Sequence, residues 1–225
     1  MNIYKNIHLY FPLACFALFV FISILSLRDQ LLAVDYRIID ALATSNPLVS
    51  QAMVGVTQIG SSEAILLVTV FVSFFLLYFR LWRETAFLYV LTIGGIALNF
   101  LLKIAFQRER PGELKSIELF DVSLEIASCS FPSGHTMRSV LLFTFLIYII
   151  HHIMKRASIR ISVIAALASI ILLVALSRII VGAHFPSDIA AAMAISISWF
   201  YLCLSLFRNK LSFHHPDRKE LPDMP

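Results

Sequence analysis

Long apolar stretches separated by short polar segments dominate this sequence. Six of them approach the length of about 20 residues with which a helix crosses the hydrocarbon core of a bilayer. They cover residues 9–27, 64–81, 85–106, 134–153, 159–180 and 188–207. None alternates strictly between apolar and polar residues as membrane β-strands do, and a helix satisfies its own backbone in lipid. The pattern predicts an all-α, polytopic membrane protein with six transmembrane helices in one bundle.

The segment between the first two expected spans, residues 28–63, is too polar to cross a bilayer. Its apolar residues recur at helical spacing, at Leu31, Leu32, Val34, Ile38, Ile39 and Leu42. This spacing is typical of an amphipathic helix that lies at a membrane surface. We expect one short interfacial helix here, followed by a turn near Gly60-Ser61-Ser62. At the other end, the proline-containing residues 213–225 are expected to form a solvated tail, which leaves residues 1–212 as a single membrane domain.

Composition supports a membrane protein and argues against two other classes. Of the 225 residues, 59% are hydrophobic and 14% are charged, which is too few polar residues for the surface of a soluble domain. The formal net charge of +4 is modest and no nucleic-acid-binding motif accompanies it, so we predict no nucleic-acid partner. Cys15, Cys129 and Cys203 form no CxxC pair and no metal-ligand spacing, so no disulfide framework is expected.

Basic residues in the connections predict the orientation of the bundle. They flank the first, second, fourth and sixth expected spans on one common side, at Lys5, Arg80, Arg83, Lys155, Arg156, Arg160, Arg208 and Lys210. The positive-inside rule makes that side cytoplasmic. The apolar stretch from Tyr10 to Leu27 lacks a small-residue cleavage site, so we expect a retained first helix and not a signal peptide.

Three groups of polar residues fall at helix ends on the outward side. They are Lys103 with Arg110-Pro111, then Pro132-Ser133-Gly134-His135, and then Ser177-Arg178 with Gly182, His184 and Asp188. Each group alone suits an ordinary role, such as a helix cap or a basic side chain that extends to the interface. Their common place at one face of the membrane predicts one shared site.

The basic residues of these groups are suited to bind phosphate. Lys103, Arg110 and Arg178 supply three positive charges, and arginine holds phosphate oxygens in bidentate fashion. Because the residue before a proline avoids the helical region, we place Arg110 just past the end of the third helix. Ser133 is placed as an N-cap, so the backbone N–H groups of Gly134 and His135 favour an anion there.

The histidines of the same groups are suited to move a phosphoryl group. His184 and Asp188 are four residues apart across Pro186, so Asp188 lies in the first helical turn and reaches back to one ring nitrogen of His184. Such a contact fixes the tautomer and makes the other nitrogen a better nucleophile. His135, on the opposite helix, is placed to protonate a leaving oxygen.

Together the three groups resemble the signature of the type-2 phosphatidic acid phosphatase superfamily. That signature reads K-x6-R-P, P-S-G-H and S-R-x5-H-x3-D, and each fixed position is matched here. The resemblance covers roughly residues 60–205 and implies a six-helix lipid phosphatase that works without a metal or another cofactor. It implies that His184 forms a phosphohistidine with the help of Asp188, that His135 is the acid, and that Lys103, Arg110, Ser133, Gly134 and Arg178 hold the phosphoryl oxygens.

These observations predict an integral membrane enzyme of a bacterial-type inner membrane, with its active site on the extracytoplasmic side. Its expected partners are membrane lipids and a lipid phosphate substrate. Undecaprenyl diphosphate and phosphatidylglycerophosphate rank first as substrates and phosphatidic acid next. Transfer of the phosphoryl group to another lipid is the alternative reaction, because the motifs do not distinguish water from an alcohol as acceptor. A transporter of a phosphorylated solute is a remote alternative, since the charges lie at helix ends and not at mid-membrane. The sequence leaves the oligomeric state open.

Overall fold

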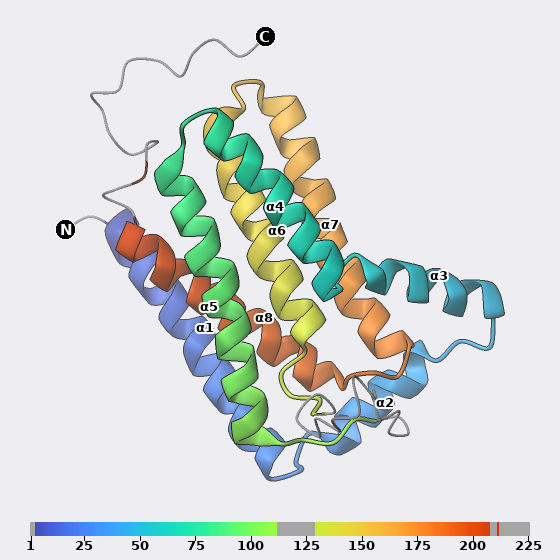
Figure 1. Ribbon diagram of the computed structural model, residues 1–225. Coiled ribbons are helices and arrows are strands. Elements are labelled where there is room, and N and C mark those ends of the chain that lie inside the picture. Colours follow the sequence, from blue (N-terminus) through green and yellow to red (C-terminus); the bar gives the residue numbers. More distant parts are fainter. Residues whose placement is uncertain (1–2, 112–128, 208–210, 212–225) are drawn as a thin grey trace, which may run out of the picture.

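A computed structural model of the chain describes residues 3–111, 129–207 and 211. Its regular structure consists of helices, with no strand in the described ranges, so the all-α prediction is confirmed (Figure 1). The helices are α1 (Ile3–Leu27), α2 (Leu32–Leu42), α3 (Pro47–Gln58), α4 (Ser62–Tyr78), α5 (Trp82–Phe106), α6 (Gly134–Ile153), α7 (Ala157–Ile180) and α8 (Pro186–Phe207). The expected tail, residues 213–225, lies outside the described residues.

Five of these helices are long and apolar enough to cross a membrane, namely α1, α5, α6, α7 and α8. The sixth expected span corresponds to α4, which has only 17 residues. It reaches spanning length together with α3, to which it is joined by a bend of 44°. The six predicted spans therefore each coincide with a helix, and the second is the shortest.

Two helices, α2 and α3, stand where the sequence predicts one interfacial helix. The break lies at Asn46-Pro47, where proline disfavours a helical conformation of the residue before it. Asn46 is extended, and its side chain accepts a hydrogen bond of 3.0 Å from the Leu48 N–H, which caps α3. The expected turn follows α3, and Ser61 caps α4 by accepting from the Ala64 N–H at 3.1 Å.

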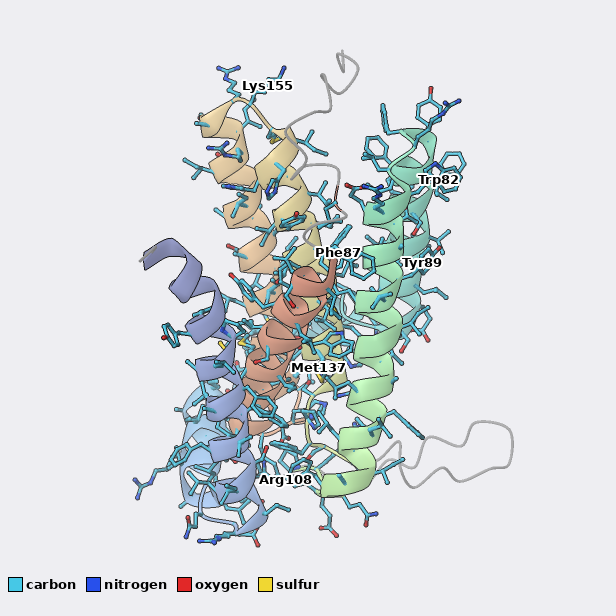
Figure 2. All side chains as sticks on the ribbon, turned by 90° about the vertical axis from the view of Figure 1, so that its left-hand side faces the viewer. Trp82, Phe87, Tyr89, Arg108, Met137 and Lys155 are labelled. Atoms are coloured by element: carbon cyan, nitrogen blue, oxygen red, sulfur yellow. The ribbon has the colours of Figure 1, made fainter. Side chains whose placement is uncertain are left out.

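The helices pack around α6 and α8, of which α6 contacts α4, α5 and α7, and α8 contacts α1, α2 and α5. Large apolar side chains such as Phe87 and Phe145 are buried in the centre, while Phe71 and Phe74 on α4 are 70% and 72% exposed. Such exposure suits a bilayer as the surrounding solvent. Figure 2 shows the long axis of the bundle, with Trp82 and Lys155 at one end and Arg108 at the other.

The end of the bundle near Arg108 collects the helix termini that carry the predicted site. The last turns of α5 and α7 and the first turns of α6 and α8 lie there, and α2 runs across the same end (Figure 1). Two residues with positive φ make the connections possible. Gln107 ends α5 at φ 44°, and Gly182 turns the chain from α7 towards α8 at φ 69°. Glycine adopts this region without a steric cost.

Candidate active site

The first turn of α6 provides a place for an anion. Ser133 is the N-cap and is fully buried, and its hydroxyl accepts hydrogen bonds from the Thr136 N–H and hydroxyl at 3.5 and 3.0 Å. The α-helix leaves the N–H groups of Gly134 and His135 without an intrahelical acceptor. A side chain at Gly134 would come within 3.1 Å of the Asn99 Oδ1 and 3.4 Å of the Arg138 Nη1, so glycine keeps this turn open.

The predicted pair of His184 and Asp188 meets at the start of α8. Asp188 lies in the first turn as expected and is completely buried, while His184 is 2% exposed. The Asp188 Oδ2 lies 3.6 Å from the His184 Nδ1, which is longer than a hydrogen bond. Catalytic hydrogen bonds are often long in the absence of substrate and shorten when it binds. The backbone also fixes His184, whose N–H donates to the Arg178 carbonyl at 3.2 Å.

Arg108, which we did not single out from the sequence, holds the other side of Asp188. Its Nη1 donates to the Asp188 Oδ1 at 2.6 Å, and its guanidinium stacks on the Phe185 ring at 4.2 Å from the ring centre. A fully buried carboxylate is strongly unfavourable without a positive partner. Arg108 therefore supplies the positive partner of the buried Asp188 and fixes its orientation, although the family signature does not include this arginine.

Asp35 on α2 completes this network from a helix that lies far away in sequence. Its Oδ2 accepts from the Arg108 Nη2 at 2.9 Å and from the Ser187 hydroxyl at 2.6 Å, and its Oδ1 accepts from the Ser187 N–H at 2.9 Å. Asp35 thus caps the first turn of α8 from outside that helix. A signal for it exists in the sequence, because Asp35 falls on the same helical face as Leu31 and Ile39. A carboxylate on an apolar face indicates a buried partner.

The predicted phosphate-binding cations gather at the same end. Lys103 is in the last turn of α5 and donates to the Cys129 carbonyl at 2.7 Å. Because α5 ends at Phe106, Arg110 reaches the site from the loop beyond the helix, as expected from the proline after it. Charge interactions link Arg110 to Lys103 and to Arg178. Partial burial lowers the pKa of Arg110 from its usual value, and the nearby Asp188 opposes this shift.

Arg178, the third predicted cation, is held by α3. Its Nη1 donates to the Thr57 hydroxyl at 2.7 Å, and both side chains are buried. Its Nε has no hydrogen-bond partner among the described residues. The sequence around Thr57 does not indicate that it contacts Arg178, because Thr57 and Arg178 are 121 positions apart.

His135 lies close to the other predicted reactive groups. It has charge interactions with His184, Arg110 and Arg178, so the two histidines share one site with the cations. Its Nδ1 lies 3.5 Å from the Nη2 of Arg138, a residue that we did not single out from the sequence. The structure thus brings all eight predicted site residues to one end of the bundle.

The protonation of His184 provides a test by pH. Burial lowers the pKa of its imidazole to about 4, and the neighbouring Asp188 opposes this shift only in part. Imidazole attacks only in its neutral form, so we expect the enzyme's contribution to kcat/KM to be lost as pH falls through about 4. A pH profile measures this, after correction for the phosphate group of the substrate, whose own pKa is about 6. A limb near the ordinary histidine pKa of about 6.5, on which the enzyme's rate falls as the pH falls, would contradict the assignment.

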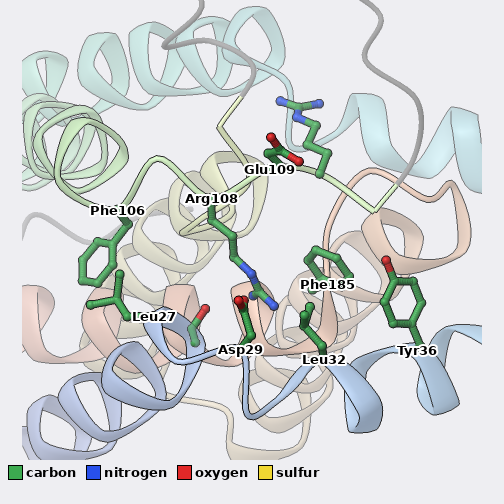
Figure 3. Close-up of a pocket in the computed structure, with 10 residues that line it drawn as sticks. Leu27, Asp29, Leu32, Tyr36, Phe106, Arg108, Glu109 and Phe185 are labelled. Carbon is green, nitrogen blue, oxygen red and sulfur yellow. The ribbon is translucent and has the colours of Figure 1, made fainter.

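A cavity of about 440 Å³ opens beside Arg110. Its lining is both polar and apolar, and comes from the end of α1, the α1–α2 connection, α2, the end of α5 with the residues after it, and the α7–α8 connection. Figure 3 shows Arg108 extending between Asp29 and Phe185 in this cavity. Of the three predicted cations, Arg110 lines this cavity.

The described residues hold no group of three His, Cys, Asp or Glu side chains that could bind a metal ion. The buried carboxylates of Asp35 and Asp188 both pair with Arg108. The acidic residues of the loop from Glu113 to Glu125 lie outside the described ranges.

Comparison with known proteins places the chain among phosphatases. Phosphatidylglycerophosphatase B of Bacillus subtilis (strain 168) is 25% identical over 197 residues, which cover 86% of this chain and 93% of that protein. The crystal structure of the first transmembrane PAP2 type phosphatidylglycerolphosphate phosphatase from Bacillus subtilis matches with a TM-score of 0.77 and 23% identity, over 91% of this chain and 99% of that one. LpxE from Aquifex aeolicus matches with a TM-score of 0.57 and 25% identity, over 76% and 94%.

A family model matches the part of the chain that carries the three motifs. The family model described as the PAP2 superfamily matches residues 83–212, which is more than half of the chain. This match confirms the resemblance found from the motifs, and the apolar helices make the protein an integral membrane protein. The chain therefore belongs to the PAP2 superfamily of membrane phosphatases.

Proposed function

We propose that this protein hydrolyses the phosphomonoester or diphosphate of a membrane lipid through a phosphohistidine on His184. The observation that carries the proposal is a buried histidine, next to a buried aspartate, among cations that gather at the first turn of α6. At neutral pH this imidazole is uncharged, because its pKa is lowered to about 4. A neutral nucleophile surrounded by positive charge is suited to attack a phosphoryl group.

In the first step a ring nitrogen of His184 forms a bond to phosphorus, and the bond from phosphorus to the lipid oxygen breaks. The Nδ1 faces Asp188, so the Nε2 is the attacking atom. Asp188 stabilises the positive charge that develops on the ring. His135 donates its proton to the leaving oxygen, and Arg108 holds Asp188 in place.

The phosphoryl oxygens are held by the predicted set of groups. Lys103, Arg110 and Arg178 supply charge, and the first turn of α6, with Ser133 as its cap and Gly134 at its start, supplies backbone N–H groups. In the second step His135 accepts a proton from water, which attacks phosphorus and breaks the bond to His184. Inorganic phosphate leaves and both histidines return to their starting states.

The substrate is proposed to be a lipid because the site lies at the end of a bundle with an apolar exterior. The candidates are undecaprenyl diphosphate, phosphatidylglycerophosphate and phosphatidic acid, and the name of the Bacillus subtilis relative supports the second. The basic residues at the opposite end, such as Lys155 and Arg156, support an outward-facing site in the bacterial inner membrane.

The test is phosphate release by detergent-purified protein in EDTA from each of these three lipids. We expect release from at least one of them without added metal, because the proposed chemistry uses only side chains. A further lipid alcohol is added as acceptor in a parallel reaction. If phosphate appears only on that acceptor and never in solution, the enzyme is a phosphotransferase. If folded protein acts on none of the lipids, the proposed function is wrong.

A further inference from the structure

Arg138 is a further arginine at the site, beyond those of the signature. It lies one helical turn after His135 on α6, and its side chain folds back towards the start of that helix. Its Nη2 lies 3.5 Å from the His135 Nδ1 and donates to the Gly60 carbonyl at 3.4 Å. Its Nη1 lies beside Gly134, where an added Cβ would approach it to 3.4 Å. The guanidinium is therefore level with the first turn of α6.

The charge of Arg138 has no close counterion in the part of the chain that the structure describes. No carboxylate there lies within 4.0 Å of it, and its buried Nε has no hydrogen-bond partner. Glu63 attracts it only from the exposed first turn of α4. Arg138 also experiences repulsion from Lys103 and Arg178. A largely buried positive charge in such surroundings favours the binding of an anion.

The position of Arg138 indicates which part of a substrate it meets. Arg108 and Asp188 contact the side of the site that holds His184, the proposed nucleophile. Arg138 instead contacts His135, the proposed acid, which must lie at the leaving oxygen. In phosphoryl transfer the attacking and leaving atoms are roughly in line on opposite sides of phosphorus. Arg138 is thus on the side of the leaving group.

We propose that Arg138 binds a second phosphate that belongs to the leaving group. This inference rests on the proposed function and narrows its substrate class to lipids with two phosphates, with a lipid diphosphate as the simplest case. When His184 bonds to the terminal phosphorus, the bridging P–O bond breaks and its electron pair stays on the bridging oxygen. That oxygen takes the proton of His135, so the product is a lipid monophosphate, and Arg138 stabilises the negative charge of its phosphate. In a phosphatidylglycerophosphate the second phosphate is the phosphodiester beyond the glycerol.

The test compares lipids that carry two phosphates with lipids that carry one. Farnesyl diphosphate is set against farnesyl monophosphate, and phosphatidylglycerophosphate against phosphatidic acid with the same acyl chains. For Arg138→Gln we expect kcat/KM to fall about tenfold to a hundredfold on the two-phosphate lipid, as for a lost charge-assisted hydrogen bond. On the matched one-phosphate lipid the loss should be clearly smaller, because that lipid has no second phosphate for Arg138 to bind. If the farnesyl pair shows this difference in loss, the second group is the other phosphate of a diphosphate. If the phosphatidyl pair shows it, the second group is the phosphodiester.

Two variants and one inhibitor complete the design. Arg160→Gln is the matched control, because this arginine lies in the first turn of α7, at the other end of the bundle, and should change neither substrate's rate. Arg138→Lys keeps the charge, so its preference for the two-phosphate lipid should fall less than that of Arg138→Gln. If the glutamine variant does not fold, the lysine variant is used in its place to test the inference. Inorganic diphosphate should inhibit the wild-type protein more strongly than inorganic phosphate, and Arg138→Lys should reduce that difference.

Equal losses on one-phosphate and two-phosphate lipids would overturn the inference, because Arg138 would then support only the transferred phosphoryl group or the fold. That result would leave the proposed function intact as long as the wild type releases phosphate. Absence of phosphate release by the folded wild type would instead refute the proposed function itself. The two failures are therefore distinguished by the wild-type measurement alone.

Discussion

Replacing His184 with alanine should abolish phosphate release, with kcat lower by at least about 10⁴-fold, as expected when a catalytic nucleophile is removed. The physical reason is that no other described side chain next to Asp188 offers a neutral ring nitrogen to phosphorus. The measurement is steady-state release from the best lipid substrate. A second readout is labelling with a lipid whose terminal phosphate carries ³²P, since the wild type should form an acid-labile phosphoprotein and the variant should not.

The matched control for this variant is His151→Ala. His151 is an exposed histidine in the last turn of α6, far from the site, so its loss should leave both kcat and the labelling unchanged. The fold of each variant is checked by gel filtration and thermal unfolding in the same detergent. Substantial activity or persistent labelling in a folded His184→Ala protein would remove His184 as the nucleophile.

Replacing Arg108 with glutamine should have the next largest effect. The change leaves Asp35 and Asp188 both buried without their common cation, and removing one member of a buried ion pair costs about 3–5 kcal/mol. We therefore expect a clear drop in the midpoint of thermal unfolding. We also expect kcat to fall by about 10²-fold or more with a smaller change in KM, because Asp188 loses its orientation towards His184 while the phosphate-binding groups stay in place.

Two further variants test the origin of this effect. Asp35→Asn keeps the contact of Arg108 with Asp188, so its loss of kcat should be smaller than that of Arg108→Gln. Arg37→Gln changes an exposed arginine on the same helix as Asp35 and should be neutral. If Arg108→Gln loses stability but keeps the wild-type kcat at low temperature, the role of Arg108 is structural only.

Local patterns predicted much of the helical framework. The lengths of the apolar stretches gave the spans, and Pro132-Ser133-Gly134 indicated the start of α6, where Ser133 is the cap. The bend between α3 and α4 was expected from Gly60-Ser61-Ser62. The extra helix α3 was missed because the apolar spacing was followed only as far as Leu42, although Asn46-Pro47 beyond it is a recognisable helix start.

Contacts between distant segments account for the rest of the site. Asp35 meets Arg108 across 73 positions, and Thr57 meets Arg178 across 121. No spacing rule along one chain predicts such pairs, because they depend on how the helices pack. Arg138, in contrast, has a signal in the sequence, because it is the one Asp, Glu, Lys or Arg residue of α6. An ionisable residue within a membrane helix indicates a functional site.

The salt bridge of Asp35 with Arg108 also limits which chimeric proteins can be made from this enzyme. The family model begins at residue 83, so Asp35 and all of α2 lie outside the region that defines the family. A chimera that joins this region to the amino-terminal helices of another enzyme would inherit Arg108 without its second carboxylate. We therefore expect a working chimera only when the two residues are transplanted together.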